Sequence, residues 1–237
     1  MSAAPSGGST TRGSSSRCQA CNSIATVPTD ATRRKLIDAA TRGFAEQGVF
    51  TASLIEITRR AGQRNRGAVH YHFGSRIGLL CAVLAEHTEF LARREGELLH
   101  AARLLPYDDV ESVVEAIVRP AAELAESGWR GRCVLLIIAE LAEEDPARLD
   151  PEIAAMLAKT GGHAVYALLE ERMPELAPDV RVERLSLATE FILRAVADRA
   201  RALGRRRRSG RPQLGHDAFV VNLVAMIAGA LSAPIGD

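Results

Sequence analysis

Apolar residues recur at helical spacing along almost the whole chain, and this periodicity constrains the fold more than any other feature. In residues 31–47, for example, Leu36, Ile37, Ala40 and Phe44 lie on one helical face. Helix-favouring Ala, Leu, Arg and Glu are abundant, and only 4% of the 237 residues are aromatic. No segment shows the alternation expected of a strand. We therefore predict an all-α fold with nine or ten helices.

Capping residues, glycines and prolines indicate where these helices begin and end. Ser53 and Glu56 have the spacing of a capping box for a short second helix that ends at Ala61, and Asn65 can cap a third. Pro120 should kink or break the helix that contains it. Besides the first two, helices are predicted over residues 66–71, 75–103, 108–126, 132–144, 150–172, 179–203 and 216–231.

The composition is that of an ordinary globular protein, with 47% hydrophobic and 25% charged residues. Four cysteines are too few for a disulfide scaffold, and the longest apolar stretches fall short of the about 20 residues that span a bilayer. A cytoplasmic location is expected. The sequence lacks a Gly-x-Ser-x-Gly elbow, a phosphate loop, a dinucleotide fingerprint and a His-Glu-x-x-His motif. We therefore expect no enzyme and no cofactor; a helical enzyme using a histidine or the acidic run is the alternative.

Residues 1–28 are rich in Ser, Gly and Thr and should form a disordered tail. Cys18 and Cys21 have the spacing of a metal knuckle, but no second pair follows, so no metal site is expected. We expect this tail to be a solvated linker; a basic arm that enters a DNA minor groove through Arg12 and Arg17 is the alternative.

The net charge of +1 conceals a strongly uneven distribution. Residues 29–76 carry nine basic side chains against four acidic ones, and the tail carries two more arginines. Residues 77–237 must therefore carry a net negative charge. A basic block joined to an acidic body is typical of a small nucleic-acid-binding module attached to another domain.

The three short helices, with an Ala61-Gly62 turn between the second and third, match a helix-turn-helix motif. Small residues at Gly67 and Ala68 would let the third helix approach base edges closely. Long polar side chains would then face phosphates or bases; these are Arg64, Asn65, Arg66, His70 and Tyr71. A small core would hold the helices, made of Leu36, Ile37, Ala40, Phe44, Ile57, Ala61, Val69 and Phe73.

Residues 32–84 resemble the TetR family of transcriptional regulators, through RRKLIDAATRGFAEQGVFTASLIEITRRAG and GAVHYHFGSRIGLLCAVL. The resemblance implies that the long polar side chains at the start of the third helix, Arg64 to Tyr71 in the set above, read bases. It also implies that Ser53 and Arg76 hold phosphates and that a dimer binds a palindromic operator. The stretch from Gly62 to Phe73 is one residue longer than the usual family pattern, and His70 stands where a tyrosine is most common.

The resemblance also implies three parts: the tail, a DNA-binding domain over residues 29–76, and a helical regulatory and dimerisation domain over residues 77–237. The body would bind a small apolar or amphipathic ligand, or else a protein partner, and the chain would act as a repressor. An intrachain core is the alternative for the residues expected at the dimer interface: Leu185, Ala188, Ile192, Val196, Phe219, Val220, Leu223, Val224 and Ile227.

Overall fold

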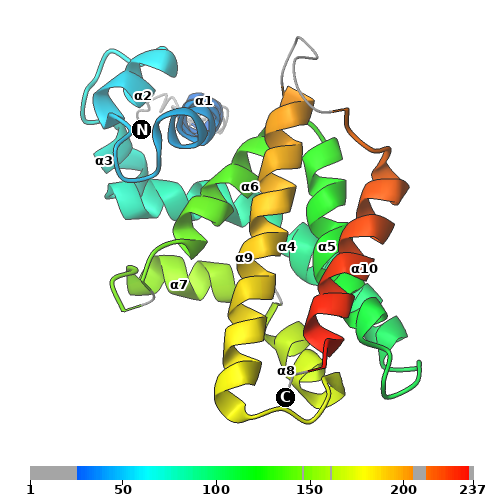
Figure 1. Ribbon diagram of the computed structural model, residues 1–237. Coiled ribbons are helices and arrows are strands. Elements are labelled where there is room, and N and C mark those ends of the chain that lie inside the picture. Colours follow the sequence, from blue (N-terminus) through cyan, green and yellow to red (C-terminus); the bar gives the residue numbers. More distant parts are fainter. Residues whose placement is uncertain (1–25, 146, 161, 205–211, 235–237) are drawn as a thin grey trace, which may run out of the picture.

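The computed structural model describes residues 26–145, 147–160, 162–204 and 212–234, in which every regular element is a helix (Figure 1). The all-α prediction is confirmed. None of the helices in these ranges has the length and apolar character needed to cross a membrane. Ten helices are described: α1 (Thr26–Gln47), α2 (Leu54–Arg60), α3 (Ala68–Phe73), α4 (Arg76–Ala102), α5 (Val110–Glu126), α6 (Trp129–Ala142), α7 (Pro151–Ala158), α8 (Gly162–Arg172), α9 (Pro178–Gly204) and α10 (His216–Ser232).

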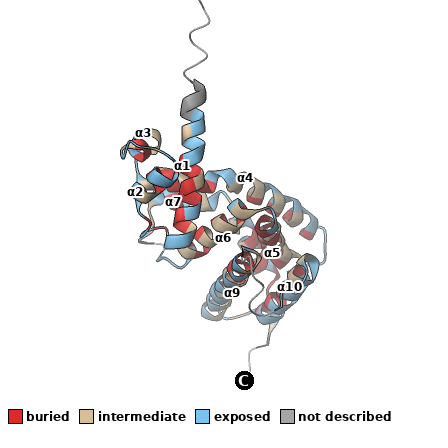
Figure 2. Ribbon diagram, turned by 90° about the horizontal axis from the view of Figure 1, so that it is seen from above, coloured by how far each residue is buried: buried red, intermediate tan, exposed pale blue. Residues whose placement is uncertain are grey.

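Helices α1 to α3 gather at one corner of the molecule, and α5, α9 and α10 pack against one another in the body (Figure 1). Seen from above, the buried faces of the helices turn toward the interior and the exposed faces outward (Figure 2). The predictions for Cys18, Cys21, Arg12 and Arg17 concern residues outside the described ranges.

Several predicted features of the helices differ from the structure. Helix α1 already includes Thr26, the first described residue and five residues before the predicted start, and Pro28 is compatible with the first turns of a helix because it needs no backbone N–H there. Residues 150–172 form two helices instead of one, because the Thr160 hydroxyl donates to the Leu157 carbonyl, 2.7 Å away, and two glycines follow. Pro120 does not break α5, which packs this proline into the buried interior.

Helix α6 joins the two hydrophobic cores of the chain. Its residues Val134, Ile137 and Leu141 pack with α1 to α4, in what we call the N-terminal core, whereas Leu135 belongs to the body core. The first turns of α4 also lie in the N-terminal core, through Leu79, Leu80, Val83 and Leu84. The prediction that the apolar segment 132–144 is central is confirmed.

The residues predicted at the dimer interface pack mainly inside the chain. This agrees with the alternative prediction that they form an intrachain core. Eight of the nine are buried in the body core and Phe219 is half-buried against it: Leu185, Ala188, Ile192, Val196, Val220, Leu223, Val224 and Ile227. Helix α5 packs against both α9 and α10 and covers these side chains. The exposed apolar residues of the two helices are Val182, Leu187, Phe191, Val221 and Met226.

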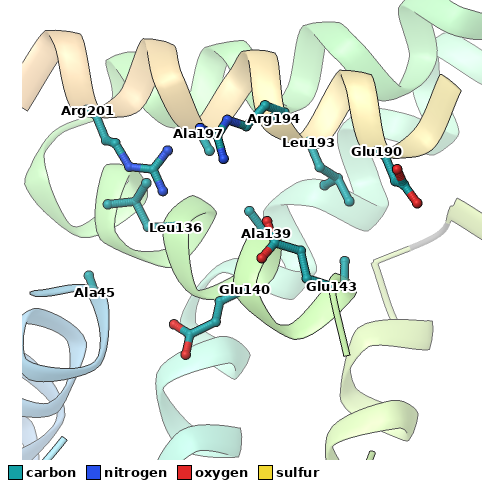
Figure 3. A pocket seen from close by; sticks show the side chains of 11 residues that line it. Ala45, Leu136, Ala139, Glu140, Glu143, Glu190, Leu193, Arg194, Ala197 and Arg201 are labelled. Carbon is teal, nitrogen blue, oxygen red and sulfur yellow. The ribbon is translucent and has the colours of Figure 1, made fainter. Parts of the chain in front are cut away.

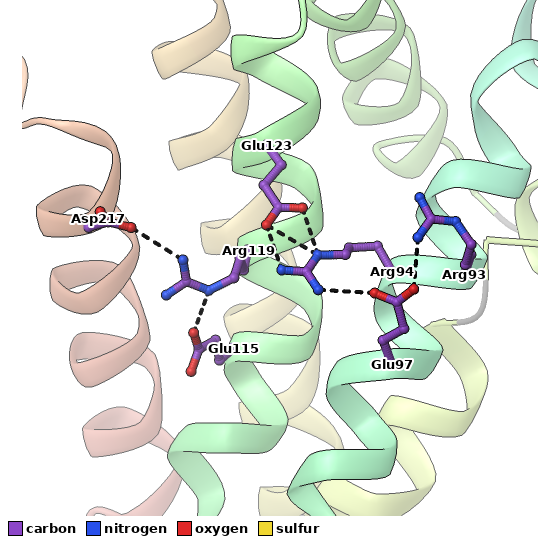
Figure 4. A network of polar contacts seen from close by, with 7 residues as sticks. All are labelled: Arg93, Arg94, Glu97, Glu115, Arg119, Glu123 and Asp217. Carbon is purple, nitrogen blue, oxygen red and sulfur yellow. Dashed lines mark hydrogen bonds and ion pairs between the residues drawn. The ribbon is translucent and has the colours of Figure 1, made fainter.

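Ion pairs link the body helices at their surface (Figure 4). Arg94 on α4 donates to Glu123 on α5 at 2.9 Å, and Arg119 on α5 reaches Asp217 on α10 at 3.3 Å. Because these side chains are partly exposed, each pair stabilises the fold by only about 0–1 kcal/mol. Their main effect is to set the relative positions of α4, α5 and α10.

One carboxyl group in the body core has no partner for one of its oxygens. Glu95 on α4 is 7% exposed, and its Oε2 makes no hydrogen bond. The nearby Tyr166 hydroxyl lies 2.6 Å from the Thr189 hydroxyl, which itself donates to the Leu185 carbonyl; Tyr166 therefore donates to Thr189 and not to Glu95. Burial raises the pKa of Glu95 to about 8, so this side chain is mostly protonated at neutral pH.

We expect Glu95→Gln to remove a pH-dependent loss of stability. A folded-state pKa above the unfolded value of 4.5 means that stability falls as pH rises from 4.5 to about 8. Relative to the variant, the wild type should lose on the order of 2 kcal/mol of unfolding free energy between pH 5.5 and 8.5. Urea unfolding at both pH values measures this. Glu89→Gln, at an exposed position of the same helix, is the control; equal pH profiles for wild type and Glu95→Gln would contradict the expectation.

Candidate nucleic-acid interface

The turn between α1 and α2 is fixed from two other helices. Gly48 adopts a positive φ of 93°, and Val49 after it is buried. The Val49 N–H donates to Glu140 Oε1 on α6 at 2.8 Å. The Arg76 guanidinium, at the start of α4, donates to the Val49 carbonyl at 2.9 Å and to the Ala52 carbonyl at 2.7 Å. The backbone N–H and carbonyl of the buried residue Val49 are therefore both hydrogen-bonded, and the turn has one defined position.

Helix α2 begins as predicted at the Ser53 cap, whose hydroxyl accepts from the Glu56 N–H at 3.4 Å. The second half of the predicted capping box is absent. Glu56 instead accepts from Arg59 at 2.7 Å and Arg60 at 3.0 Å, and these hydrogen bonds lower its pKa to about 2. Arg60 also donates to Glu46 on α1 at 2.8 Å. Both arginines of α2 are thus paired with carboxylates.

The segment between α2 and α3 has the form of a helix-turn-helix turn. Gly62 takes a positive φ of 71°, which glycine adopts without strain. The Asn65 side-chain oxygen accepts from the Gly67 N–H at 2.9 Å, and α3 begins at Ala68, two residues later than predicted. Arg64, Asn65 and Arg66 therefore lie in the turn ahead of α3, where all three are exposed.

Helix α3 has one buried and one exposed face. Ala68 and Val69 are buried in the N-terminal core, so Ala68 packs the helix against that core; its role in close approach to base edges stays a prediction. His70 is exposed, and its Nδ1 donates to the Gly74 carbonyl at 2.8 Å, which leaves Nε2 free to point outward. Tyr71 is 79% exposed. The structure thus brings five predicted residues to one exposed turn and helix start, and we call this set the reading surface: Arg64, Asn65, Arg66, His70 and Tyr71.

Cations are available at this end of the molecule. In the part of the chain that the structure describes, Arg64 and Arg66 have no ion-pair partner, and the same holds for Arg34 and Lys35 on α1. Arg33 lies over the Phe73 ring at 5.0 Å, which links α1 to the end of α3. These side chains can bind phosphates, while hydrogen-bonding groups on the reading surface can reach base edges.

Two residues position this site without belonging to its surface. Arg76 was predicted to hold a phosphate, and that role stays a prediction; in the structure its guanidinium binds two backbone carbonyls. Glu140 was not predicted at all. It lies 91 residues after Val49 in the sequence, so no local pattern could reveal their contact.

In a comparison with known proteins, residues 36–83 match the family model described as bacterial regulatory proteins, tetR family. The chain is 50% identical over 54 residues to the HTH-type transcriptional regulator SrpR of Pseudomonas putida, covering 23% of this chain and 25% of SrpR. It is 36% identical over 86 residues to the HTH-type transcriptional regulator BetI of Escherichia coli (strain K12 / DH10B), covering 36% of this chain and 42% of BetI. The chain thus matches less than half of the length of these curated relatives.

The likeness to solved structures extends over most of the chain. The fatty acid degradation regulator FadR from Bacillus halodurans matches with a TM-score of 0.54 at 18% identity, over 84% of this chain and 96% of that one. The ketosteroid transcriptional regulator KstR2 of Mycobacterium tuberculosis matches with a TM-score of 0.53 at 17% identity, over 85% and 95%. These similarities show that the N-terminal helices and the body together have the same fold as these two solved structures.

We expect Arg76→Ala to destabilise the N-terminal domain. The substitution leaves the buried Val49 carbonyl without its donor, which costs about 1–3 kcal/mol of unfolding free energy. Arg76→Lys should recover only part of this, since an ammonium group cannot match the planar fork that reaches both carbonyls. Arg66→Ala, at an exposed unpaired site, is the control for loss of an arginine. Thermal unfolding followed by circular dichroism gives the comparison, and equal midpoints for Arg76→Ala and Arg66→Ala would contradict this role.

Proposed function

We propose that the whole chain is a DNA-binding transcriptional regulator, because residues 36–83, which include its helix-turn-helix, match the model of bacterial regulatory proteins of the tetR family. In this proposal it acts as a dimeric repressor on a palindromic operator and releases DNA when a small apolar or amphipathic ligand binds. The observation that carries the proposal is the reading surface: exposed polar side chains ahead of and along a short helix that is anchored by its opposite face.

The reading surface fits the major groove of DNA. Arg64 and Arg66 are exposed and unpaired among the described residues, so they can donate to guanine acceptors or to phosphates. The Asn65 oxygen is committed to the Gly67 N–H, but its amide nitrogen remains a donor. The small N-terminal domain, with its backbone turns fixed by hydrogen bonds, holds these groups in a constant arrangement.

Dimerisation is supported by an apolar face that the described residues leave uncovered. Phe191 on α9 and Met226 on α10 are 43% and 49% exposed and line a groove of about 340 Å³ between the two helices. Leu187 and Val221 extend the same apolar character along α9 and α10. Small exposed residues on α10 would allow close approach of a second helix: Ala218, Ala225, Gly229 and Ala230. We propose that a second copy of the chain packs here, which would pair two reading surfaces for the two halves of an operator.

The first test is to select bound duplexes from a random DNA pool and from the region upstream of the gene itself. We expect one sequence with two-fold symmetry to be enriched. Arg66→Ala should weaken binding to it by about 10- to 100-fold in fluorescence anisotropy, because a bidentate base contact is worth about 1–3 kcal/mol. Arg103→Ala is the matched control and should bind as the wild type does, because Arg103 is an exposed residue at the C-terminal end of α4, whereas the N-terminal end of α4 follows α3. No enriched sequence, or equal losses for both variants, would contradict the proposed function.

The second test concerns the dimer. Phe191→Glu or Met226→Glu would place a charge in the proposed interface, so sedimentation at micromolar concentration should shift from dimer to monomer. Leu104→Glu is the control, because Leu104 is 77% exposed in the connection after α4, away from the groove. Both interface positions are already partly solvent-exposed, so unfolding midpoints should change little. A dimer that survives both substitutions would show that the chains associate elsewhere.

A further inference from the structure

A cleft of about 600 Å³ lies where the N-terminal domain meets the body (Figure 3). It is formed by α6 and α9, with Ala45 of α1 at its edge. We propose that this cleft is a regulatory site for a small amphipathic organic cation, and that the cation acts on DNA binding through Glu140. The regulatory part rests on the proposed function; the binding part does not.

The charges around the cleft favour a cation. Glu140, Glu143 and Glu190 line it, together with Arg194 and Arg201. The two arginines are paired with a further carboxylate, Asp198, at 3.6 Å and 2.9 Å. Glu143 and Glu190 have no ion-pair partner among the described residues. Together with Asp198, the cleft therefore has four carboxylates against two guanidinium groups, and this negative excess attracts a positive group.

The remaining lining is apolar. Leu136 and Ala139 come from α6, and Leu193 and Ala197 come from α9. Glu143 reaches into the gap between these two helices, so a positive group bound to it would lie beside the aliphatic side chains (Figure 3). A ligand with both an ammonium group and a hydrocarbon part satisfies both kinds of surface. A fully hydrophilic cation would leave the leucines without a contact, and a neutral hydrocarbon would leave the carboxylates without one.

Glu140 connects the cleft to the DNA-binding domain. Its side chain lines the cleft and accepts the Val49 N–H at 2.8 Å, which holds the α1–α2 turn. A cation bound beside Glu143 competes with Val49 for the Glu140 carboxylate. When Glu140 turns toward the cation, the buried Val49 N–H loses its acceptor and the turn loses one of its two anchors, Arg76 being the other.

The consequence is a coupling between the two sites. The turn immediately precedes the Ser53 cap, so a displaced turn changes the position of α2 and the approach of α3 to DNA. A cation that binds the displaced form better must lower DNA affinity, and DNA must lower cation affinity by the same factor. We expect this factor to be about tenfold, within the usual range of coupling between sites.

The binding test uses three probes that share a hydrocarbon part and differ in charge: 4-phenylbutylammonium, 4-phenylbutanol and 4-phenylbutyrate. Titration calorimetry on the full chain without DNA should show binding of the ammonium probe, with at least about tenfold weaker binding of the other two. Equal binding of the three probes, or no binding of the ammonium probe, would overturn the proposal.

Substitutions locate the binding. The double variant Glu143→Gln/Glu190→Gln should weaken binding of the ammonium probe by about tenfold, because it removes the two exposed carboxylates that attract the ammonium group. The matched control, Glu144→Gln/Glu183→Gln, removes the same charge from exposed positions beside the cleft and should bind the probe as the wild type does. Both variants should bind DNA normally when no probe is present. Equal effects of the two variants on probe affinity would place the probe elsewhere and overturn the site.

Glu140→Gln tests the coupling itself. The glutamine oxygen still accepts the Val49 N–H, so DNA binding should persist. Because the amide is neutral, the cation attracts it only weakly and does not compete with Val49 for it. The probe should lower the DNA affinity of the wild type about tenfold and that of Glu140→Gln by less than about twofold. An equal decrease in both proteins would overturn the role of Glu140. Failure of the proposed function looks different, since the chain would then select no DNA sequence in the absence of any probe.

Discussion

The positions of α2 and α3 depend on how the backbone polar groups of one buried residue, Val49, are hydrogen-bonded. Val49 lies in the turn after α1, its side chain is fully buried, and both of its backbone polar groups need partners away from water. Glu140 accepts its N–H from α6, and Arg76 donates to its carbonyl from α4. These partners come from helices that also belong to the body. The turn therefore has a defined place only when the body is folded against it, and the Ser53 cap, α2 and α3 follow from that place.

Helix α6 transmits structure between the two parts because it contributes to both. Val134, Ile137 and Leu141 pack in the N-terminal core, while Leu135 packs in the body core. Polar contacts at its N-terminal end reinforce the link: Arg130 donates to Asp38 on α1 at 2.7 Å, and Arg42 of α1 stacks on the Trp129 ring at 3.7 Å. A shift of α6 relative to α9 must therefore move α1 or break these contacts. A cleft between α6 and α9 is well placed for a ligand that changes this balance.

The sequence allowed prediction of what short-range chemistry determines. Ser53 and Ser75 cap α2 and α4 as their spacing indicates, and Gly74 ends α3 with a positive φ of 74°. The reading surface followed from the same local signals together with the resemblance to a known family. Long-range contacts could not be predicted, because nothing near Val49 indicates Glu140. Periodicity in α9 and α10 correctly identified an apolar stripe, but it could not tell that α5 covers that stripe and leaves Phe191 and Met226 exposed.

The basic charge of residues 29–76, which first indicated a nucleic-acid partner, overstates what is available to DNA. Arg59 and Arg60 are bound to Glu56, Arg76 to two carbonyls, and Arg42 to the Trp129 ring. The residues without such commitments among those described are Arg34, Lys35, Arg64 and Arg66. Each phosphate contact contributes to affinity and to its salt dependence, so these four side chains alone give one copy a small electrostatic contribution to DNA affinity. Under the proposed function, a second copy on the same duplex doubles that contribution, and a ligand that changes the spacing of the two reading surfaces acts on the contacts of both copies at once.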